Sequence, residues 1–402
     1  MESIEQMIKR LCPKGVEWKK ISEIGTIYRG VAFSKKDFTE KGTPCIHYGQ
    51  IYTKFGNYAH KTYTYVSEQL SKGKKLAQKG DLVMAVTSEN MEDVGKCLAW
   101  LGEEDILVSN HACYIRHSLN PMYLAYYLQS AHFFNYKKKI SKGVKVIDLD
   151  LNMFGDMLIP VPPMEVQNRI VEVLDKMTTL TAELEAEMEA RKQQYEYYRN
   201  KLLSFNEIGE ANRQVTWKKI SEIGQICMCK RIMKDQTHKQ GEIPFYKIGT
   251  FGGTADAYIS RELFEDYRAR FKFPKKGDLL ISAAGTIGKT VVFDGKDSYF
   301  QDSNIVWVDN DETIVTNRYL YHIYKIINWK TDGGTIRRLY NDNLRNTIIP
   351  VPSMEEQSRI VSILDRFEAL TTDLQSGLPA EIEARRQQYE YYRNKLLTFE
   401  AV

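Results

Sequence analysis

The eleven residues QQYEYYRNKLL at positions 193–203 occur again, unchanged, at positions 387–397. Two shorter segments repeat in the same way: WKKISEIG begins at Trp18 and at Trp217, and IPVP begins at Ile159 and at Ile349. Eleven identical residues in a row do not arise by chance, and their spacing gives a period of about 190 to 200 residues. The chain is therefore a tandem pair of long units rather than a solenoid of short repeats.

Each unit opens on WKKISEIG, continues through residues that differ between the copies, and closes on IPVP and a charged segment. The divergent parts keep a common frame, because GDLV at 80–83 matches GDLL at 277–280 and a Gly-Lys pair follows in both copies. Two copies that share their structural motifs but differ in most other residues indicate two modules that perform one task on two targets.

The composition is that of a folded protein. At about 150 residues per domain, 402 residues indicate two or three domains, and 43% hydrophobic with 27% charged residues excludes wholesale disorder. The first ten residues lack the apolar run of a signal peptide, and no stretch approaches the roughly 20 apolar residues that span a bilayer. Six unevenly spaced cysteines form no disulfide framework, so we expect a cytoplasmic, reduced chain.

The divergent halves are expected to be mixed α+β. Apolar runs bounded by Gly, Asp, Asn and Lys predict strands, and longer periodic runs predict short helices. The expected strands cover residues 82–87, 112–115, 279–283, 290–293 and 305–308, and the expected helices cover residues 121–134 and 317–329.

The charged segment of the first copy carries a heptad pattern. Its apolar residues alternate at spacings of four and three, which is the seam of a coiled coil; Thr181 and Arg191 are the polar exceptions. Pro162 and Pro163 block a helix before it, so the helix is expected to start at Met164 or the next residue. The predicted seam consists of Ile170, Leu174, Met177, Leu184, Met188, Tyr195, Tyr198 and Leu202.

The second charged segment repeats the seam with an interruption. Four extra residues between Leu374 and Ile382 make a stutter, and Gly377 and Pro379 within it predict a kink or a break. Long amphipathic helices are unstable alone, so we expect the two to pair, antiparallel if the globules dock at opposite ends. The alternative is that each helix packs only on its own globule. The second seam consists of Ile360, Leu364, Phe367, Leu374, Ile382, Tyr389, Tyr392 and Leu396.

The two helical segments carry net charges of −2 and −3, which leaves +9 for the rest of a chain whose total is +4. Basic globules on an acidic spacer fit contact with a polyanion, although an ordinary soluble surface explains the same charge. Lysine and arginine contact phosphates, while arginine, asparagine and glutamine read base edges. The candidates near basic, tyrosine-rich clusters are Arg29, Lys35, Lys36, Gln50, Lys74, Lys75, Asn90, Lys142, Lys145, Lys230, Arg231, Lys234, Arg270, Arg337, Arg338 and Asn341.

No catalytic or metal site is expected. The AAGTIGKT segment at 283–290 imitates a phosphate-binding loop, but a predicted strand follows it where the mechanism needs a helix N-terminus. The pair Cys227 and Cys229 lacks further ligands at zinc spacing, and the chain contains neither a methyl-donor loop nor an [N/D]PP[Y/F] motif. The seven histidines are scattered without the context of a nucleophile.

The arrangement resembles the specificity subunit (HsdS) of type I restriction–modification enzymes over essentially the whole chain. The resemblance rests on the duplicated IPVP…Q-x-R-I-V…LD openers at 159–175 and 349–365, on the duplicated QQYEYYRNKLL ends and on the GDLLISAAGTIGKT-like strand. It implies two target recognition domains that read the halves of a bipartite site in double-stranded DNA. It also implies paired helices that dock two methyltransferase subunits.

In this family the partners bind S-adenosylmethionine, motor and nuclease subunits join for restriction, and the specificity subunit binds no cofactor and catalyses nothing. The expected segments are an N-terminal helical segment (1–14), recognition domain 1 (15–162), helix 1 (163–206), recognition domain 2 (207–352) and helix 2 (353–402). A helix of ~40 residues is ~60 Å long, or at most ~17 base pairs, and would fix the gap between half-sites. The competing hypotheses are a coiled-coil scaffold that reads no DNA and a nucleotide hydrolase using residues 283–290.

Overall fold

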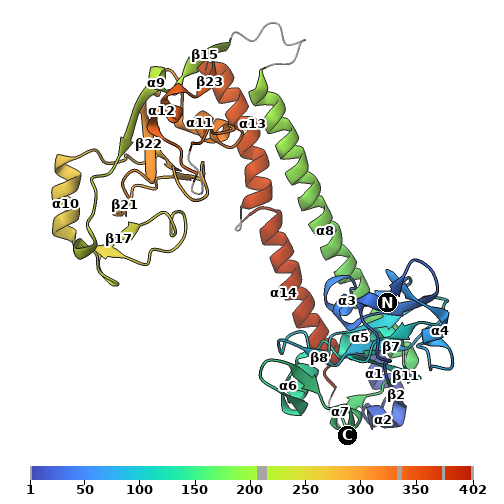
Figure 1. The fold of residues 1–402 in the computed structure, drawn as a ribbon. Helices are drawn as coiled ribbons and strands as arrows, with labels where there is room; N and C mark the ends of the chain where they lie inside the picture. Colours follow the sequence, from blue (N-terminus) through green and yellow to red (C-terminus); the bar gives the residue numbers. More distant parts are fainter. Residues whose placement is uncertain (1, 206–214, 333–336, 374–375, 400–402) are drawn as a thin grey trace. The chain divides into compact units, whose positions relative to one another are not determined.

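The computed structural model describes residues 2–205, 215–332, 337–373 and 376–399. They form two compact units, coloured along the chain in Figure 1. Unit 1 contains residues 1–185 and 381–402, and unit 2 contains residues 186–380. Unit 2 is thus one continuous segment, whereas unit 1 is built from both ends of the chain.

Unit 1 is built around a five-stranded mixed sheet in the order β2-β11-β7-β9-β5, with β11 antiparallel to both neighbours. The strands of this sheet are β2 (Gly25–Arg29), β11 (Ala112–His117), β7 (Leu82–Ala85), β9 (Cys97–Trp100) and β5 (Tyr58–Ala59). A second sheet contains β10 (Leu107–Val108), β4 (Thr43–Ile46), β6 (Thr64–Val66) and β3 (Phe38–Thr39). Smaller sheets join β12 (Ser141–Lys142), β13 (Ile147–Leu149) and β8 (Thr87–Ser88), and β1 (Trp18–Lys20) with β14 (Leu158–Pro160).

The helices of unit 1 are short, apart from those of the charged segments. They are α1 (Ile4–Leu11), α2 (Ile21–Ile24), the 3-10 turn η1 (Lys35–Asp37), α3 (Tyr48–Thr53), α4 (Glu68–Ser71), α5 (Pro121–Tyr127), α6 (Ala131–Ile140) and α7 (Leu151–Gly155). The long helix α8 (Met164–Ser204) contributes residues 164–185 to unit 1 and residues 186–204 to unit 2.

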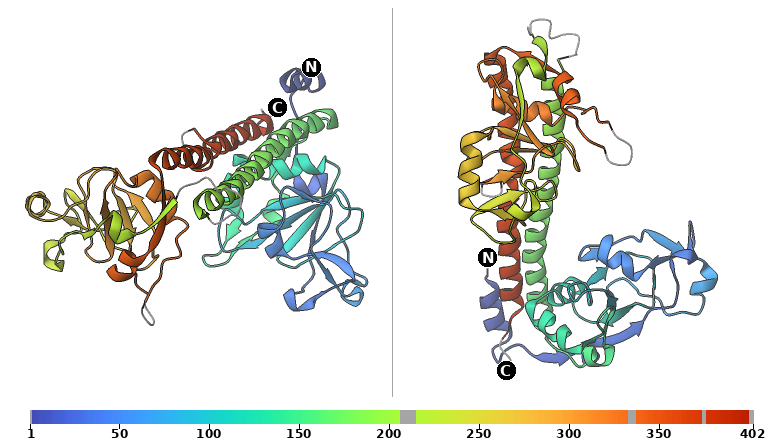
Figure 2. Two further views of the ribbon diagram at one scale, coloured as in Figure 1. Left: turned by 90° about the horizontal axis from the view of Figure 1, so that it is seen from above. Right: turned by 60° about the vertical axis from the view of Figure 1, so that its left-hand side comes forward.

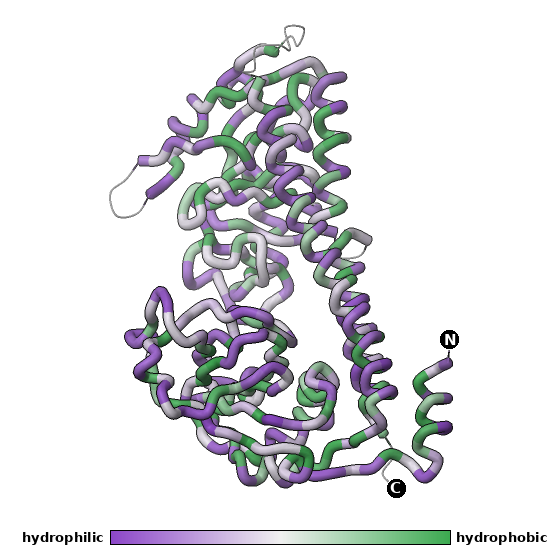
Figure 3. The backbone as a smooth tube through the Cα atoms, turned by 90° about the vertical axis from the view of Figure 1, so that its right-hand side faces the viewer, coloured by the Kyte–Doolittle hydropathy of each residue, from purple (hydrophilic) through white to green (hydrophobic). Residues whose placement is uncertain are grey.

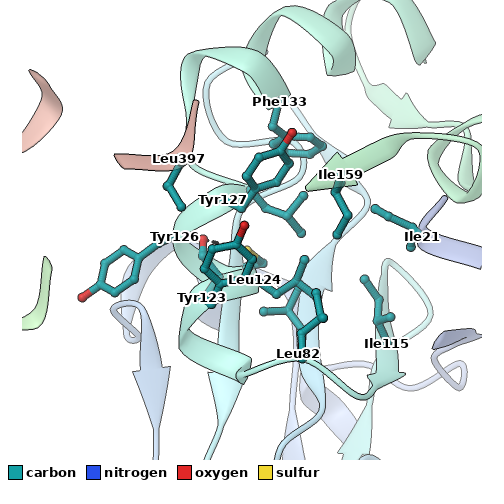
Figure 4. Packing of buried hydrophobic residues seen from close by; sticks show 14 of the residues in the cluster. Ile21, Leu82, Ile115, Tyr123, Leu124, Tyr126, Tyr127, Phe133, Ile159 and Leu397 are labelled. Atoms are coloured by element: carbon teal, nitrogen blue, oxygen red, sulfur yellow. Dashed lines mark hydrogen bonds between the residues drawn. The ribbon is translucent and has the colours of Figure 1, made fainter. Parts of the chain in front are cut away.

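The central strand β7 is buried on both faces, so its residues alternate between two cores. Leu82 and Met84 pack in the cluster that contains α5, and Val83 and Ala85 pack in the cluster under α3. Figure 4 shows the first cluster, where Tyr123, Tyr126 and Tyr127 of α5 lie beside Leu397 from the end of the chain.

Unit 2 repeats this frame, with fewer strands among its described residues. Its four-stranded sheet has the order β16-β22-β19-β20, which corresponds to β2-β11-β7-β9 of unit 1. These strands are β16 (Gly224–Met228), β22 (Ile305–Asn310), β19 (Leu279–Ser282) and β20 (Thr290–Val292). The remaining strands are β18 (Tyr258–Ile259), β17 (Ile243–Tyr246) and β21 (Tyr299–Phe300) in one sheet, and β15 (Val215–Lys219) with β23 (Ile348–Pro352) in another. The helical elements are α9 (Ile220–Ile223), the 3-10 turn η2 (Lys234–Gln236), α10 (Arg261–Arg270), α11 (Asn317–Tyr324), α12 (Asn341–Asn346) and α13 (Met354–Thr372).

The duplication extends to individual hydrogen bonds. The hydroxyl of Tyr123 donates to the carbonyl of Pro160 at 3.0 Å, and Tyr319 donates to Pro350 at 3.0 Å. These bonds tie the first helix after the central strands to the IPVP segment in each unit. IPVP is thus a structural strand shared by the copies, which explains why it is repeated.

The predicted strands are confirmed to within two residues, and the mixed α+β class of both halves is confirmed. Two helix boundaries were wrong. The single helix predicted over 121–134 is two helices, because the Ser130 side chain accepts from the backbone N–H of Phe133 and starts α6 separately. The helix predicted over 317–329 ends at Tyr324.

The long helices follow the sequence pattern closely. α8 begins at Met164 as predicted, and the predicted break is confirmed because α13 ends at Thr372 and α14 (Leu378–Leu397) begins after Gly377. The seam residue Leu374 lies outside the described residues. Hydrophobic and hydrophilic residues alternate along these helices in Figure 3.

Within unit 1, α8 and α14 run in opposite directions. Ile170 and Leu174 share a core cluster with Leu396 and Phe399, whereas Glu185 pairs with Arg386 further along α8. The same cluster contains residues of the globule, so the helices pack on each other and on the globule at once. Helix pairing and helix-to-globule packing, which the sequence left as alternatives, therefore coexist.

Within unit 2, α8 and α13 lie side by side (Figures 1 and 2). Tyr198 stacks on Phe367 with ring centroids 5.6 Å apart, and Tyr195, Ile360 and Leu364 are buried in the core cluster. The outer seam residues are less enclosed, because Tyr198 and Tyr392 each remain 38% exposed. The remaining seam residues split into buried Ile382 and partly buried Met177, Leu184, Met188, Leu202, Tyr389 and Leu396.

Candidate nucleic-acid interface

In unit 1, basic side chains gather around a partly exposed tyrosine on strand β2. The Lys75 ammonium lies 4.7 Å from the centre of the Tyr28 ring, and the Arg116 guanidinium lies 5.7 Å from it. Arg116 also pairs with buried Asp81 at 2.9 Å, which fixes its position. Arg29 follows Tyr28 on β2 and is exposed. The sequence prediction missed Arg116, because only the strand register places it beside Tyr28.

The other predicted lysines of this region lie on exposed turns. Lys35 and Lys36 form the 3-10 turn η1, whose N-cap is the Ser34 hydroxyl, and Lys74 follows helix α4. Exposed lysines on turns suit contacts with phosphates.

The two predicted base readers of unit 1 already have partners within the protein. The Gln50 side-chain oxygen accepts from the backbone N–H of His47 at 2.9 Å and closes the capping box of α3. The Asn90 oxygen accepts from the backbone N–H of Asp93 at 2.8 Å, and its amide nitrogen donates to the Asp93 carboxylate. Their base-reading role stays a prediction, and it requires these bonds to be shared or broken.

Lys142 and Lys145 belong to the hairpin formed by β12 and β13. Lys142 lies 3.2 Å from the Asp150 carboxylate yet remains 75% exposed, and Lys145 is exposed at the hairpin tip. Glycine stands between them at the turn, as the sequence pattern indicated.

In unit 2, two predicted residues meet on one aromatic ring. The Lys230 ammonium lies 5.2 Å from the centre of the Phe271 ring, and the Arg270 guanidinium lies 5.3 Å from it. Arg270 also pairs with Asp266 one turn earlier in α10, at 2.9 Å. Arg231 pairs with Asp302 at 2.8 Å, and Lys234 opens the exposed turn η2.

The segment after α10 adds a basic hollow to this surface. The hollow has a volume of 510 Å³, and four cations and three phenylalanines line it. Two of these lysines form ion pairs with the Asp309 carboxylate, Lys272 at 3.2 Å and Lys275 at 3.4 Å. Four cations around one hollow suit contacts with the phosphates of a nucleic-acid backbone. The lining cations are Arg268, Lys272, Lys275 and Lys276, and the rings are Phe271, Phe273 and Phe293.

The third predicted group of unit 2 precedes helix α12. The Arg338 guanidinium donates to the Asn304 side chain at 2.6 Å, and its backbone pairs with Asp332. Arg337 is exposed, and Asn341 is the first residue of α12. The structure therefore gives Arg338 a structural partner and leaves the Arg337 side chain at the surface.

Comparison with known proteins agrees with this duplicated, basic architecture. The family described as "Type I restriction modification DNA specificity domain" matches the chain twice, at residues 13–191 and 212–384. A type I restriction enzyme specificity subunit of Haemophilus influenzae is 42% identical over 396 residues, which cover 96% of each chain. The chain belongs to the type I specificity-subunit family.

Other specificity subunits extend the comparison. An Escherichia coli specificity subunit is 33% identical over 62% of this chain and 65% of its own length. A chain from a structure of complex assembly in a type I system has a TM-score of 0.66 at 19% identity, covering 96% of this chain and 98% of its own. The HsdS subunit of Thermoanaerobacter tengcongensis has a TM-score of 0.52 at 17% identity, covering 96% and 97%. The two structural matches show the fold.

Residues 283–290 of this specificity subunit, whose sequence is similar to a phosphate-binding loop, have a structural role. The Lys289 ammonium donates to the backbone carbonyl of Phe251 at 2.6 Å, and Lys96 at the matching place in unit 1 donates to Tyr52 at 3.2 Å. Strand β20 follows Lys289 directly, so a helix N-terminus that could hold phosphate is not formed there. The nucleotide-hydrolase hypothesis therefore lacks its geometry.

One group among the described residues of the specificity subunit is compact enough to hold a metal ion, and the sequence prediction missed it. Ligand atoms of His322, Asp365 and Glu368 lie within 4.8 Å of one another. The carboxylates are already neutralised, because Arg318 reaches both at 2.8 Å and Lys325 reaches Glu368. Two cations in contact with the ligands disfavour a further cation, so this group fits an ionic lock between α11 and α13.

The electrostatics of the lock follow from its burial. Burial lowers the pKa of His322 below its ordinary value, although the 2.7 Å contact with Asp365 opposes this change. Burial alone would raise the pKa of Asp365, but bonds from Arg318 and His322 outweigh it and hold that pKa low. In unit 1 the matching contact joins the Tyr126 hydroxyl to the Asp175 carboxylate.

None of the helices described in the structure is both long and apolar enough to cross a membrane.

Proposed function

We propose that each unit of this specificity subunit reads one half of a bipartite site in double-stranded DNA, and that the chain itself catalyses no reaction. The observation that carries the proposal is the duplicated frame with two different basic, aromatic surfaces. Unit 1 gathers cations on Tyr28, and unit 2 gathers them on Phe271. Different surfaces on one frame suit two different half-sequences.

We also propose that the helices dock two methyltransferase subunits, one for each copy of QQYEYYRNKLL. The repeated segment presents the same exposed side chain in each unit, because Tyr197 is 58% exposed and Tyr391 is 61% exposed. Two identical surfaces suit two copies of one partner. Exposed tyrosines are frequent anchors of protein interfaces.

The chemistry would then belong to the partners. The methyltransferase subunits would bind S-adenosylmethionine, and motor and nuclease subunits would join for restriction. The six cysteines are free, which supports a reducing compartment, and we place the complex in the cytoplasm.

The test is genome-wide adenine methylation mapped by single-molecule sequencing. A host without type I systems would express the chain with its candidate methyltransferase subunit, and a second culture would express the methyltransferase alone. We expect a new gapped motif in the first culture only. If both proteins are soluble and co-purify but no motif appears, the chain is a scaffold or has the wrong partner, and direct DNA-binding assays follow.

A further inference from the structure

The hairpin of β12 and β13 in unit 1 ends in a tip that carries two valines with a lysine between them. The tip reads Gly143-Val144-Lys145-Val146, where Val144 is 95% exposed and Val146 is 52% exposed. An isolated exposed apolar residue needs no explanation. Two valines at the most exposed point of a hairpin, with cations beside them, form a defined surface that the sequence prediction did not use.

The tip is held in one conformation by its backbone. Gly143 has φ +115, a conformation that residues with a side chain rarely adopt. A Cβ atom at this position would lie 1.9 Å from the carbonyl oxygen of Val146, so only glycine fits. The turn therefore closes directly beneath the two valines and presents them outward.

The base of the hairpin is anchored to the rest of unit 1. Strand β13 pairs with β8 through Ile147 and Ser88, and the Thr87 hydroxyl donates to the Asp148 carboxylate at 2.5 Å. Thr87 is itself held, because its carbonyl accepts from the Tyr52 hydroxyl. A small rigid hairpin on an anchored base can probe a surface without a large cost in conformational entropy.

The exposed valines of the tip suit the major groove of DNA better than the minor groove. A two-stranded ribbon fits the major groove of B-DNA, where the thymine C5 methyl is the apolar group displayed by a base. The minor groove displays no methyl group. Lys142 precedes the tip and Lys145 stands between its two valines, and both side chains are exposed, which suits contacts with phosphates near the groove.

We propose that Val144 contacts the C5 methyl of a thymine in the half-site read by unit 1, with Lys142 and Lys145 contacting the flanking phosphates. This inference rests on the proposed DNA-reading function, and it adds a residue that specifies a base. It concerns one half-site only, since residues 333–336 at the matching position of unit 2 lie outside the described residues.

The experiment uses the full chain in its complex with the methyltransferase subunit and measures binding to duplexes that contain the methylated motif. Each thymine of the motif is replaced in turn by uracil, which removes the methyl group and keeps base pairing. We expect one replacement, in one half-site, to weaken binding of the unchanged complex about 3- to 10-fold, the effect of burying one methyl group. Val144→Ala should weaken binding to the thymine duplex to a similar extent, and uracil at that position should then have no further effect.

Two further variants serve as controls. Val292→Ala makes the same change at a valine of unit 2 that is 41% exposed, and it should leave the uracil response of the first half-site unchanged. Lys145→Gln should weaken binding to all sequences alike and lower the slope of log affinity against log salt by about one.

The outcomes separate the inference from the function on which it rests. If the motif exists but Val144→Ala leaves every uracil effect intact, the valine reads no thymine methyl. If Val144→Ala changes binding while uracil has no effect anywhere, the tip acts as a wedge or reads shape, and the inference is wrong. If the variant stops co-purifying with the methyltransferase, the hairpin is a protein contact. Absence of any gapped motif with the unchanged chain would refute the proposed function itself.

Discussion

Gln167 and Gln357 are the buried glutamines of the repeated helix openers, 2% and 0% exposed. The amide of each donates to the carbonyl of the proline five residues earlier, Pro162 or Pro352. The side-chain oxygen of each glutamine accepts from the backbone N–H of a helix N-cap residue, Asn120 before α5 or Thr316 before α11. One side chain thereby joins the long helix, the IPVP strand and the globule, and the glutamine is repeated because the joint is repeated.

At this scale Gln357→Leu should destabilise unit 2 by about 3 kcal/mol. The change leaves the N–H of Thr316 and the carbonyls of Ile314 and Pro352 without this partner, and each buried unpaired group costs about 1–3 kcal/mol. The measurement is the midpoint of urea unfolding. Gln193→Leu makes the same change at an exposed site and should shift the midpoint little; equal shifts for both variants would contradict the role of the joint.

The ionic lock predicts a pH dependence. His322 has a lowered pKa in the folded protein, so the unfolded chain binds more protons and stability falls as pH drops through the ordinary histidine range, from about 7 to 5. Asp365 and Glu368 have lowered pKa values in the folded protein, so their protonation reduces stability only at lower pH, below about 4.5. His322→Tyr, which copies Tyr126 of unit 1, should lose less stability between pH 7 and 5 in urea titrations. An unchanged pH dependence would show that other groups carry it.

At the scale of elements, α8 is a single helix of 41 residues, whereas its counterpart is divided into α13 and α14. Glycine at position 377 fits this division, because a Cβ there would lie 2.6 Å from the carbonyl of Ala369. The chain can pass this close to the end of α13 only because residue 377 has no side chain. The two copies therefore share the same heptad seam, but the first is one continuous helix and the second is divided into two helices.

If the helices set the gap between half-sites, their length controls it. Insertion of seven residues in α8 after Glu185, and of seven in α14 after Ala380, keeps the heptad phase and adds ~10.5 Å, or about three base pairs. We expect methylation of the same half-sites with a gap three base pairs longer. A matched four-residue insertion breaks the phase and should abolish methylation. A change of half-site sequence at constant gap would refute the ruler.

The elements show what the sequence could and could not predict. Pro162, Pro163 and Gly377 act locally, so the start of α8 and the break before α14 could be predicted from the sequence. Ser130 also acts locally, but its capping role depends on a hydrogen bond that composition does not reveal, and two helices were merged into one. The site was harder, because the bond from the Gln50 amide to the Thr64 hydroxyl and the position of Arg116 beside Tyr28 depend on contacts between segments distant in sequence.

At the scale of the whole molecule, the identical tyrosines predict a stoichiometry. Tyr391→Ser removes one exposed anchor and leaves Tyr197 in place, so we expect the complex to lose one methyltransferase and keep the other. Native mass spectrometry counts the subunits directly. The double variant should lose both, and Tyr58→Ser, at a tyrosine that is 50% exposed elsewhere in unit 1, should lose neither. Loss of both subunits from the single variant would show that the two do not dock independently.

The two units also predict separable sequence preferences. Exchange of residues 28–158 for the matching segment of another family member should change one half of the methylated motif and leave the other half and the gap intact. Sequencing of the methylated genome reads all three at once. A change in both halves would show that the recognition surfaces are not confined to their own units.

The discontinuity of unit 1 has a consequence for synthesis on the ribosome. Unit 2 is one continuous segment, whereas the core of unit 1 includes Leu397 and Phe399, which are made after all of unit 2. The core of unit 1 therefore cannot close until residues 381–399 have been made, while unit 2 can close as it leaves the exit tunnel. Until then the apolar side chains of Ile170 and Leu174 lack their final partners. Termination before residue 381 should therefore damage unit 1, although most of its residues have already been made.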